Sequence, residues 1–521
     1  MAYIIGIDTG GTYTDAVLLD TENGHILAKA KAFTTKEDLS VGIKGSLRGL
    51  GTLPQKIEKV VLSTTLATNA VVEDELAPVG ALYIGKAPRG EFPNIPFEIL
   101  RGKINVKGRE EVRLDEDEIH SALDRLLPKV SAVAVIGYMS VRNPLHELKV
   151  KEMVREHGSL PVVCGHELSG SLGFKERAAT AILNAALLPV IAGFLDSMER
   201  VLRELSVNAP VFVVRGDGTM AELDYIRNRP AETILSGPAT SIIGAKYLTG
   251  VSSALISDMG GTTTDTAVLE HGTVCLSDSG AVVGPWRTHI PSAELHTCGI
   301  GGDSAITFDG ELRVGPKRAL PVCRGGTILT PTDLLHCFGD FVRWDEKAAR
   351  KGAEDFAEKI GISTEHLLDI TKRGVLDGLA SALPLEKSLP VIAIGAPVGY
   401  WFLEAKKRFG FELVIPEHHE VANAVGAAAA EWKERVFALV RPGEDGHGYL
   451  AHTPTARYAF REKEDAVKKA IAAAKEAAEQ RLKIQGAVRM ESVVERRDIM
   501  EKSCGTYMET RITVTSTGYL I

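Results

Sequence analysis

The chain has few of the features that mark secreted, nucleic-acid-binding or membrane-spanning proteins. Its six cysteines are scattered and none forms a C-x-x-C pair, which favours reduced, mostly buried thiols over disulfides. The net charge is −8 and no long Lys/Arg stripe offsets it, which argues against a general nucleic-acid binder. We find no apolar run of about 18 residues that would predict a membrane span, and residues 1–5 lack the basic region of a signal peptide. We therefore expect a cytoplasmic protein without a membrane segment.

The composition and the order of elements indicate an α/β protein of several domains. A chain of 521 residues predicts two to four domains, and strand-like runs that alternate with helical stretches predict a largely parallel α/β architecture. Residues 176–198 have the periodicity of a long helix, with a break or kink expected at Pro189. After a Pro/Gly/His-rich linker, a charged helix (462–482) and two strands predict a small α/β appendage. We place the domains at residues 1–190, 191–440 and 441–521.

The most informative feature that is present is a phrase that occurs twice, D-x-G-G-T-x-T-D. It spans residues 8–15 and again residues 258–265, at a constant offset. A strand-like run precedes each copy, and a second apolar run and a turn follow it. The duplication predicts two related half-molecules that face one ligand.

The residue types in this phrase suit a phosphate chain and magnesium. Glycines let backbone N–H groups approach a phosphate closely, threonine hydroxyls donate to its oxygens, and a carboxylate at a strand end can hold hydrated Mg²⁺. Two copies could clamp a phosphate chain from opposite sides. The alternative is a pair of ordinary polar hairpin turns, because Asp, Gly and Thr are common in turns. The shared flanking pattern favours the phosphate site.

Two other groups of polar residues are weaker candidates. One stretch combines imidazole, thiol and carboxylate groups that could bind Zn²⁺ or another transition metal, namely His289, Glu294, His296, Cys298 and Asp303. Its spacing matches no metal motif, so a polar loop is the favoured interpretation. A polar substrate pocket could be formed by Arg142, His146, Glu147, Glu176, Arg177 and Asn184. Surface ion pairs or helix caps explain each of these residues at least as well.

Taken together, the motifs resemble the hydantoinase A / 5-oxoprolinase family within the actin-like ATPase superfamily. The resemblance rests on the two duplicated phrases and on four further segments, at residues 63–70, 142–147, 236–239 and 296–304. It covers roughly residues 3–430. It implies an α/β fold with two ribonuclease-H-like domains around a nucleotide cleft, followed by the small C-terminal α/β appendage.

The same resemblance implies ATP and Mg²⁺ as cofactors. Asp8 and Asp258 would be the catalytic carboxylates and would hold Mg²⁺ through water. The nucleotide would contact Gly10, Gly11, Thr12, Gly260, Gly261, Thr262, Thr263, Gly301, Gly302 and Gly395. Asp15 and Asp265 would either join this site or bond to N–H groups of their own turns.

Two positions depart from the family pattern. Ala396 and Pro397 follow Gly395 in a turn where paired glycines are common, and Asp303 stands where a glycine is usual. A carboxylate at this place repels phosphates unless Mg²⁺ or a basic residue lies between them.

These observations lead us to expect an ATP-dependent hydrolase or a hydrolase/carboxylase subunit. It would activate the carbonyl oxygen of a small cyclic amide, such as a hydantoin or 5-oxoproline, by phosphoryl transfer. The alternatives are a small-molecule kinase and a nucleotide-gated regulatory ATPase without small-molecule turnover. The resemblance implies a small-molecule substrate and a B-type partner subunit, and we also expect a homo-oligomer.

Overall fold

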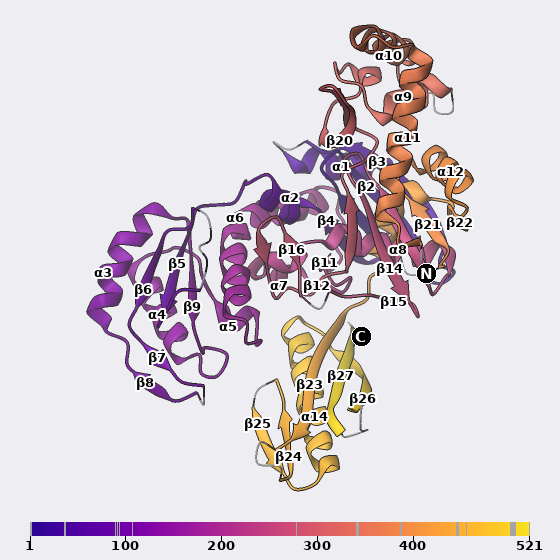
Figure 1. The fold of residues 1–521 in the computed structure, drawn as a ribbon. Helices are drawn as coiled ribbons and strands as arrows, with labels where there is room; N and C mark the ends of the chain where they lie inside the picture. Colours follow the sequence, from indigo (N-terminus) through magenta and orange to yellow (C-terminus); the bar gives the residue numbers. More distant parts are fainter. Residues whose placement is uncertain are drawn as a thin grey trace.

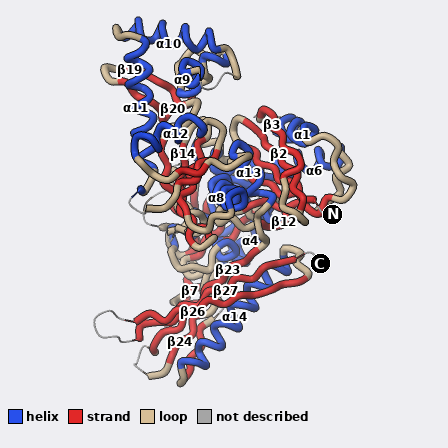
Figure 2. The backbone as a smooth tube through the Cα atoms, turned by 90° about the vertical axis from the view of Figure 1, so that its right-hand side faces the viewer, coloured by secondary structure: helices blue, strands red, loops and turns tan. Residues whose placement is uncertain are grey.

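The computed structural model contains four main sheets (Figures 1 and 2). It describes residues 3–35, 38–88, 90, 92, 94–106, 108–277, 279–339, 343–385, 388–443, 447–454, 456–500 and 507–519. Two of the sheets carry the duplicated phrases, a third forms a separate outer domain, and the fourth lies at the C-terminal end of the chain.

The first sheet has the strand order β12-β11-β4-β1-β2-β3. Strands β1, β2 and β3 form an antiparallel meander, and β4 and β11 continue the sheet in parallel with β1. The bounds are β1 (Tyr3–Thr9), β2 (Tyr13–Asp20), β3 (Ile26–Phe33), β4 (Ile57–Thr64), β11 (Val211–Val214) and β12 (Met220–Glu222). Strand β1 is buried along almost its whole length, as expected for a strand covered on both faces.

The second sheet repeats these strand relations. Strand β13 pairs antiparallel with β14 and parallel with β21, which is followed by β22, and β15 and β18 both pair with β14. The bounds are β13 (Ala254–Met259), β14 (Thr264–Glu270), β15 (Thr273–Val274), β18 (Leu295–Cys298), β21 (Val391–Ile394) and β22 (Leu413–Val414). The two copies of the phrase therefore lie on hairpins, β1–β2 and β13–β14, that hold equivalent positions in their sheets.

The third sheet belongs to residues 79–164, which we call the outer domain. All strands of this sheet are parallel, in the order β10-β9-β5-β6, and β7 and β8 form a separate antiparallel pair. The elements are β5 (Val79–Ile84), β6 (Phe97–Leu100), β7 (Lys103–Ile104), β8 (Glu110–Val112), α3 (Glu116–Leu126), β9 (Ala132–Gly137), α4 (Leu145–His157) and β10 (Val162–Cys164). The outer domain occupies the left of Figure 1, with α6 (Phe174–Glu204) between it and the first sheet.

The fourth sheet is antiparallel, in the order β25-β24-β23-β27-β26, and helix α14 covers one of its faces (Figure 2). Its elements are β23 (Lys433–Pro442), β24 (Tyr449–His452), β25 (Arg457–Phe460), α14 (Lys463–Ile484), β26 (Arg489–Met500) and β27 (Tyr507–Tyr519). The charged helix expected at residues 462–482 is α14. Alanines on one side of this helix pack against the sheet, which explains its Ala-rich composition.

The sheets do not follow the expected boundaries. A boundary at residue 190 falls inside helix α6, and strands β11 and β12 beyond it join the first sheet. The fourth sheet begins at Lys433, before the linker that was taken as its start. Pro189 lies within α6 without ending it.

Helix α6 corrects the expectation that no segment is apolar enough to cross a membrane. Among the described residues it is the one helix that reaches the required length and hydropathy. However, 72% of its most apolar window is buried inside the protein. It packs against β5 and β9 on one side and α1 on the other, so it occupies the position of a core helix.

The remaining helices cover the sheets or extend from the second sheet. They are α1 (Leu39–Gly49), α2 (Leu66–Val72), α5 (Gly165–Leu168), α7 (Leu223–Asn228), α8 (Ser236–Thr249), α9 (Pro331–Phe338), α10 (Glu346–Ile360), α11 (Thr364–Ala382), α12 (Val398–Phe409) and α13 (Ala422–Ala428). The short strands β16 (Val282–Val283), β17 (Trp286–Arg287), β19 (Ser304–Phe308) and β20 (Leu312–Arg318) form two small hairpins.

Helices α8 and α13 connect the two phrase-bearing sheets. Helix α13 packs on β1 and α8 packs on β13, and the two helices contact each other. Their contact is backbone on backbone: a Cβ added to Gly244 would lie 1.9 Å from the carbonyl oxygen of Ala422, and one added to Gly426 would lie 1.9 Å from that of Thr240. Only glycine fits at these two positions.

We expect Gly244→Ala to destabilise the protein by about 1–3 kcal/mol, because the added methyl must push the two helices apart. Thermal unfolding measures the loss. The control is Gly399→Ala on α12, where an added Cβ meets nothing within 4 Å. Equal melting temperatures for wild type and Gly244→Ala would contradict the close contact.

Candidate functional site

The two copies of the phrase fold in the same way. We call residues 8–15 the first loop and residues 258–265 the second loop. Asp8 pairs with Asp15 across the first hairpin, and Asp258 pairs with Asp265 across the second. Each turn is closed by one backbone hydrogen bond, from Gly10 N to Tyr13 O (3.0 Å) and from Gly260 N to Thr263 O (2.9 Å). The predicted duplication is thus present in the backbone as well as in the sequence.

The loops leave their next backbone donors available. The N–H groups of Gly10 and Gly260 are used within the turns, whereas those of the following two residues in each loop have no hydrogen-bond partner among the described residues. These donors belong to Gly11, Thr12, Gly261 and Thr262. Free N–H groups in a glycine turn form a concave site for an anion.

Burial makes ionisation unfavourable for the first carboxylate of each loop, Asp8 and Asp258. Burial, together with the nearby charge of Asp15, raises the pKa of Asp8 to about 7. Burial also raises the pKa of Asp258, although Ser241 Oγ at 2.5 Å and Asn423 Nδ2 at 3.3 Å donate to its Oδ2 and partly offset this. A nearby dication would favour the ionised form of both groups.

The closing carboxylates accept hydrogen bonds from side chains. Asp15 accepts from Lys31 Nζ at 2.7 Å, and Asp265 accepts from Thr297 Oγ1 at 2.6 Å. Burial raises the pKa of Asp265 to about 6. Of the two alternatives, bonding to N–H groups of their own turns has no support among the hydrogen bonds of the described residues.

Three buried oxygens at the first loop have no hydrogen-bond partner among the described residues: Asp8 Oδ1, Thr9 Oγ1 and Asp15 Oδ1. Buried polar atoms are nearly always paired, so each such atom requires an explanation. Carboxylate and hydroxyl oxygens at the mouth of a glycine turn suit a hydrated Mg²⁺ and the phosphate oxygens that it binds. The donor set therefore fits the cofactors that the phrase suggests.

Residues 299–304 pack directly against the second loop. Gly302 N donates to Gly260 O at 3.0 Å, and Asp303 N donates to Gly261 O at 2.6 Å. A Cβ on Gly301 would lie 2.6 Å from the backbone of Gly261 and Thr262. The glycines predicted to line the nucleotide thus lie beside the second loop.

Gly395 follows β21 and packs against the end of β13. Its φ is +104°, and a Cβ there would lie 2.2 Å from Met259 O and 3.0 Å from Asp258 Oδ1. A side chain at this position would press on the carboxylate of Asp258. Pro397 in the same turn lies 3.7 Å from where a Cβ of Gly302 would be, so this turn and residues 299–304 are neighbours.

Arg318 on β20 connects the first loop to Asp303, which packs on the second loop, and no motif in the sequence indicated this residue. Its Nη2 donates to Thr12 Oγ1 at 2.5 Å and lies 3.7 Å from Asp303 Oδ2. Arg324 lies 3.9 Å from the same carboxylate oxygen. The basic residues required beside Asp303 are therefore present, and they place positive charge between the loops.

Other contributors were also missed, namely Lys31, Ser241 and Asn423. The last two flank Asp258 from α8 and α13, the helices that lie between the sheets. Ser241 and Asn423 lie on helices that are rich in small residues. This composition indicates close packing of the helices, but it does not predict a bond to a carboxylate.

Comparison with known proteins identifies the chain. Residues 4–158 match the hydantoinase/oxoprolinase N-terminal region, and residues 177–436 match the hydantoinase/oxoprolinase domain. Caprolactamase subunit alpha of Pseudomonas jessenii is 30% identical over 478 residues, which cover 79% of this chain and 68% of the relative. The chain belongs to the hydantoinase/oxoprolinase family.

Other members of this family are more distant. The acetophenone carboxylase gamma subunit of Aromatoleum aromaticum is 27% identical over 449 residues, covering 73% of this chain and 60% of the relative. The crystal structure of ATP-dependent caprolactamase from Pseudomonas jessenii superposes with a TM-score of 0.74 at 22% identity, over 99% of this chain and 87% of the other. A nucleotide-free acetone carboxylase structure gives 0.75 at 19% identity, over 99% and 88%. These structures share the mixed α/β fold.

In the structure, residues that the sequence suggested as one metal site lie in different places. His289 Nδ1 bonds to Ser169 Oγ at 2.8 Å, beside the start of α6, whereas Asp303 lies against the second loop. Strand β18 carries His296 and Cys298 beside β14. The candidate is therefore wrong as one ligand set.

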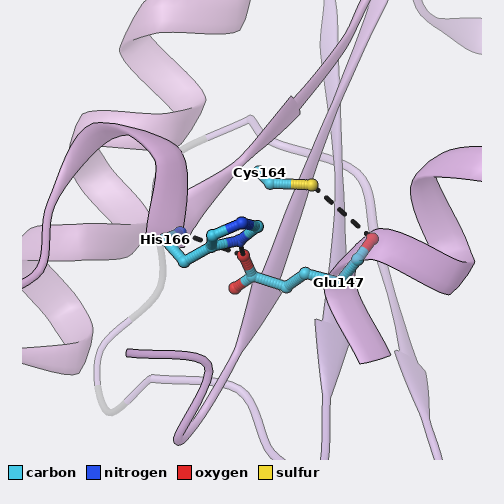
Figure 3. Close-up of side chains that lie close together, drawn as sticks. All are labelled: Glu147, Cys164 and His166. Carbon is cyan, nitrogen blue, oxygen red and sulfur yellow. Dashed lines mark hydrogen bonds and ion pairs between the residues drawn. The ribbon is translucent and has the colours of Figure 1, made fainter. Parts of the chain in front are cut away.

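Within the part of the chain that the structure describes, the compact group of possible ligands is Glu147, Cys164 and His166 (Figure 3). His166 Nδ1 lies 2.5 Å from Glu147 Oε2, and the Cys164 thiol donates to the backbone oxygen of Glu147. Glu147 also accepts from Gly137 N at 2.6 Å and from His166 N at 2.9 Å. Burial raises the pKa of the Cys164 thiol far above its usual range. These bonds satisfy the carboxylate, so the group acts as a brace between β9, α4 and α5.

Five of the residues expected to form a polar substrate pocket lie in three different places. His146 lines a cavity of about 410 Å³ in the outer domain, and Glu147 and Arg177 lie behind its wall. Asn184 instead bonds to the backbone of Asn228 and Ala231 on the other side of α6. Glu176 faces His289.

Proposed function

We propose that this chain binds MgATP between the first and second loops and uses it to activate the carbonyl oxygen of a small cyclic amide. The observation that carries the proposal is the pair of matched hairpins, each with a carboxylate at the end of its first strand and unused N–H donors in its turn. The common strand order of the two sheets supports a pair of ribonuclease-H-like, actin-like halves around one nucleotide.

Each residue of the loops would have a defined task. MgATP, when bound, supplies the phosphoryl group for the carbonyl oxygen. Asp8 and Asp258 would hold the hydrated metal, and Ser241 and Asn423 fix the orientation of Asp258. The free N–H groups of the loops would donate to phosphate oxygens, which is electrostatic stabilisation by fixed dipoles.

The names of the relatives support the substrate class and a partner. Caprolactamase subunit alpha is named for a cyclic amide, and the acetone and acetophenone carboxylase relatives are also named as subunits. The chain spans between 60% and 70% of the length of these three relatives. We therefore propose a cyclic-amide hydrolase that works with a second, B-type subunit.

A substrate screen tests the proposal. ADP release is followed with 5-oxoproline, hydantoin, caprolactam and simple ketones, with and without proteins that co-purify with the chain. Ring opening coupled to ADP release supports the cyclic-amide hydrolase. Carboxylation of a ketone would instead indicate that the chain is a carboxylase subunit. A stable phosphorylated product would indicate a kinase instead. ATP hydrolysis that no small molecule stimulates would indicate a regulatory ATPase.

Arg318 offers a test of the nucleotide position. We expect Arg318→Gln to raise the KM for ATP by roughly 10- to 100-fold, because a charged donor between the loops would be lost. Arg313→Gln on the same strand is the matched control, since Arg313 pairs only with the exposed Asp309 and Glu311 among the described residues. The same KM for both variants would argue against nucleotide binding between the loops.

A further inference from the structure

The cavity of the outer domain lies where an open parallel sheet forms a ligand crevice. From β5 the chain moves to β6 on one side, and it then returns to place β9 and β10 on the other side of β5. In such sheets, ligands bind at the carboxyl ends of the two strands where the order reverses. The cavity is lined by residues 84–86, which follow β5, and residues 137–140, which follow β9.

Two buried charged side chains, Glu147 and Arg177, hold the segment after β9 that forms one wall of the cavity. Glu147 accepts from Gly137 N, and Arg177 Nη2 donates to the carbonyl oxygens of Gly137 and Tyr138, both at 2.9 Å. The exposed fractions of Glu147 and Arg177 are 0% and 1%. Burying charged groups is costly, and an ordinary surface turn does not require it. Rigid support of this kind is typical of a binding site.

His146 lines the cavity and bonds through one of its two ring nitrogens. Its Nε2 lies 2.7 Å from Glu110 Oε1. Because a carboxylate only accepts, Nε2 carries the proton of this bond, and Nδ1 is an acceptor whenever the ring is neutral. The residue is 3% exposed, and Nδ1 has no partner among the described residues. It lies beside Gly102, which also lines the cavity.

The charge at the cavity favours an anion. Lys86 Nζ lies 3.6 Å from the centre of the Tyr138 ring, and no carboxylate of the described residues is within ion-pair distance of it. The other lysine of the lining, Lys103, is already paired with Glu111 at 2.7 Å. The rest of the wall is largely apolar, with Ile84, Ile104, Val106 and Met139. A volume of about 410 Å³ is within the range of small-molecule sites.

We propose that this cavity binds a small carboxylic acid that carries an amide N–H or a hydroxyl group beside an apolar body. The carboxylate lies at Lys86, the N–H or O–H donates to His146 Nδ1, and the apolar body packs on the isoleucines and Met139. The site shares no lining residue with the two loops, so the molecule has a second ligand site that does not depend on the proposed ATP site.

Methyl NMR locates the ligand directly, because Ile84, Ile104 and Met139 each carry a methyl group at the wall. The first probe is N-acetylleucine, within a panel of N-acyl amino acids and 2-hydroxy acids of similar size. We expect saturable shifts of these methyl signals. N-acetylleucine amide, which lacks the carboxylate, and 4-methylpentanoate, which lacks the N–H, are expected to bind at least roughly tenfold more weakly.

Two variants and one separation control complete the test. Lys86→Gln is expected to weaken binding by roughly tenfold or more. Lys149→Gln is the matched control and leaves binding unchanged, because Lys149 on α4 pairs with Glu116 and does not line the cavity. Asp8→Ala also leaves it unchanged, which separates this site from the loops. The proposal is overturned if no acid of the panel shifts these methyl signals, if Lys86→Gln binds as wild type does, or if the acid and its neutral amide bind equally.

Discussion

Replacement of Asp8 by asparagine is expected to lower ATP turnover, the activity proposed for this chain, by at least roughly 100-fold, the order of effect seen when one electrostatic group of a catalytic site is removed. Asp8 is buried, and one of its oxygens has no partner among the described residues. The side chain therefore contributes little to folding that asparagine cannot replace. A coupled ADP-release assay measures the loss, and Asp258→Asn is expected to give a similar result.

The stability of the Asp8 variant separates a catalytic role from a structural one. In metal-free protein the folded pKa of Asp8 is about 7, against an ordinary value of 3.8. Between these values the folded state holds an extra proton, so this group's contribution to stability falls as pH rises through the window. Asp8→Asn removes that dependence and is expected to be at least as stable as wild type at pH 8. Near-normal ATP turnover in both aspartate variants would refute the site.

A matched control lies on the next strand. Asp20 is also a buried carboxylate, but it accepts from Glu22 N at 2.9 Å and Asn23 Nδ2 at 3.0 Å within the turn after β2. Asp20→Asn weakens these bonds. It is therefore expected to lower thermal stability while leaving the rate of ATP turnover close to that of wild type, which is the opposite pattern to Asp8→Asn.

Replacement of Arg215 by methionine is expected to cost about 3–5 kcal/mol of stability, as breaking a buried ion pair does. Arg215 follows β11 in the first sheet, and its Nη1 donates to Glu434 Oε1 on β23 of the fourth sheet at 2.6 Å. Its Nη2 donates to Lys433 O at 2.6 Å. Burial raises the pKa of Glu434, but the charges of Arg215 and Arg481, together with hydrogen bonds from Arg215 and Gln485, hold it below its usual value. Without Arg215 this buried carboxylate keeps the hydrogen bond from Gln485 Nε2 at 2.8 Å but only a long ion pair, with Arg481 at 3.8 Å.

Denaturant unfolding and hydrogen exchange over residues 433–519 measure the effect. The double variant Arg215→Met with Glu434→Gln removes the stranded charge, so it is expected to recover part of the lost stability. Arg227→Met is the control, because Arg227 pairs with the exposed Asp196 and Glu199 and such pairs contribute at most about 1 kcal/mol. If Arg215→Met costs no more than Arg227→Met, the pair does not anchor the fourth sheet.

The sequence predicted the loops well because the information is local. Each phrase specifies a strand, a glycine turn and a second strand within a few residues, and both hairpins form with the carboxylates in equivalent registers. The final helix was predicted for the same reason, since its alanines recur on one side of a continuous helical run.

What could not be predicted depends on contacts between distant segments. Nothing local shows that β11 pairs with β4 rather than with the second sheet, so the boundary at residue 190 misses it. Arg318 reaches Thr12 across 306 positions, and no motif contains both residues. The predicted metal site was wrong for the opposite reason. Its residues are close in sequence, but the chain turns between His289 and Asp303, so these two residues have different neighbours.

The glycine contact between α8 and α13 has a consequence for motion between the two halves. Interlocked side chains resist sliding, because each step requires changes of rotamer. Here the helices touch through backbone at Gly244 and Gly426, with no side chain to interlock at that point. Asp258 is held by one residue from each helix, Ser241 and Asn423. If a nucleotide binds between the loops as proposed, a small rotation of one half at this helix contact would therefore first displace the carboxylate of Asp258 in the second loop.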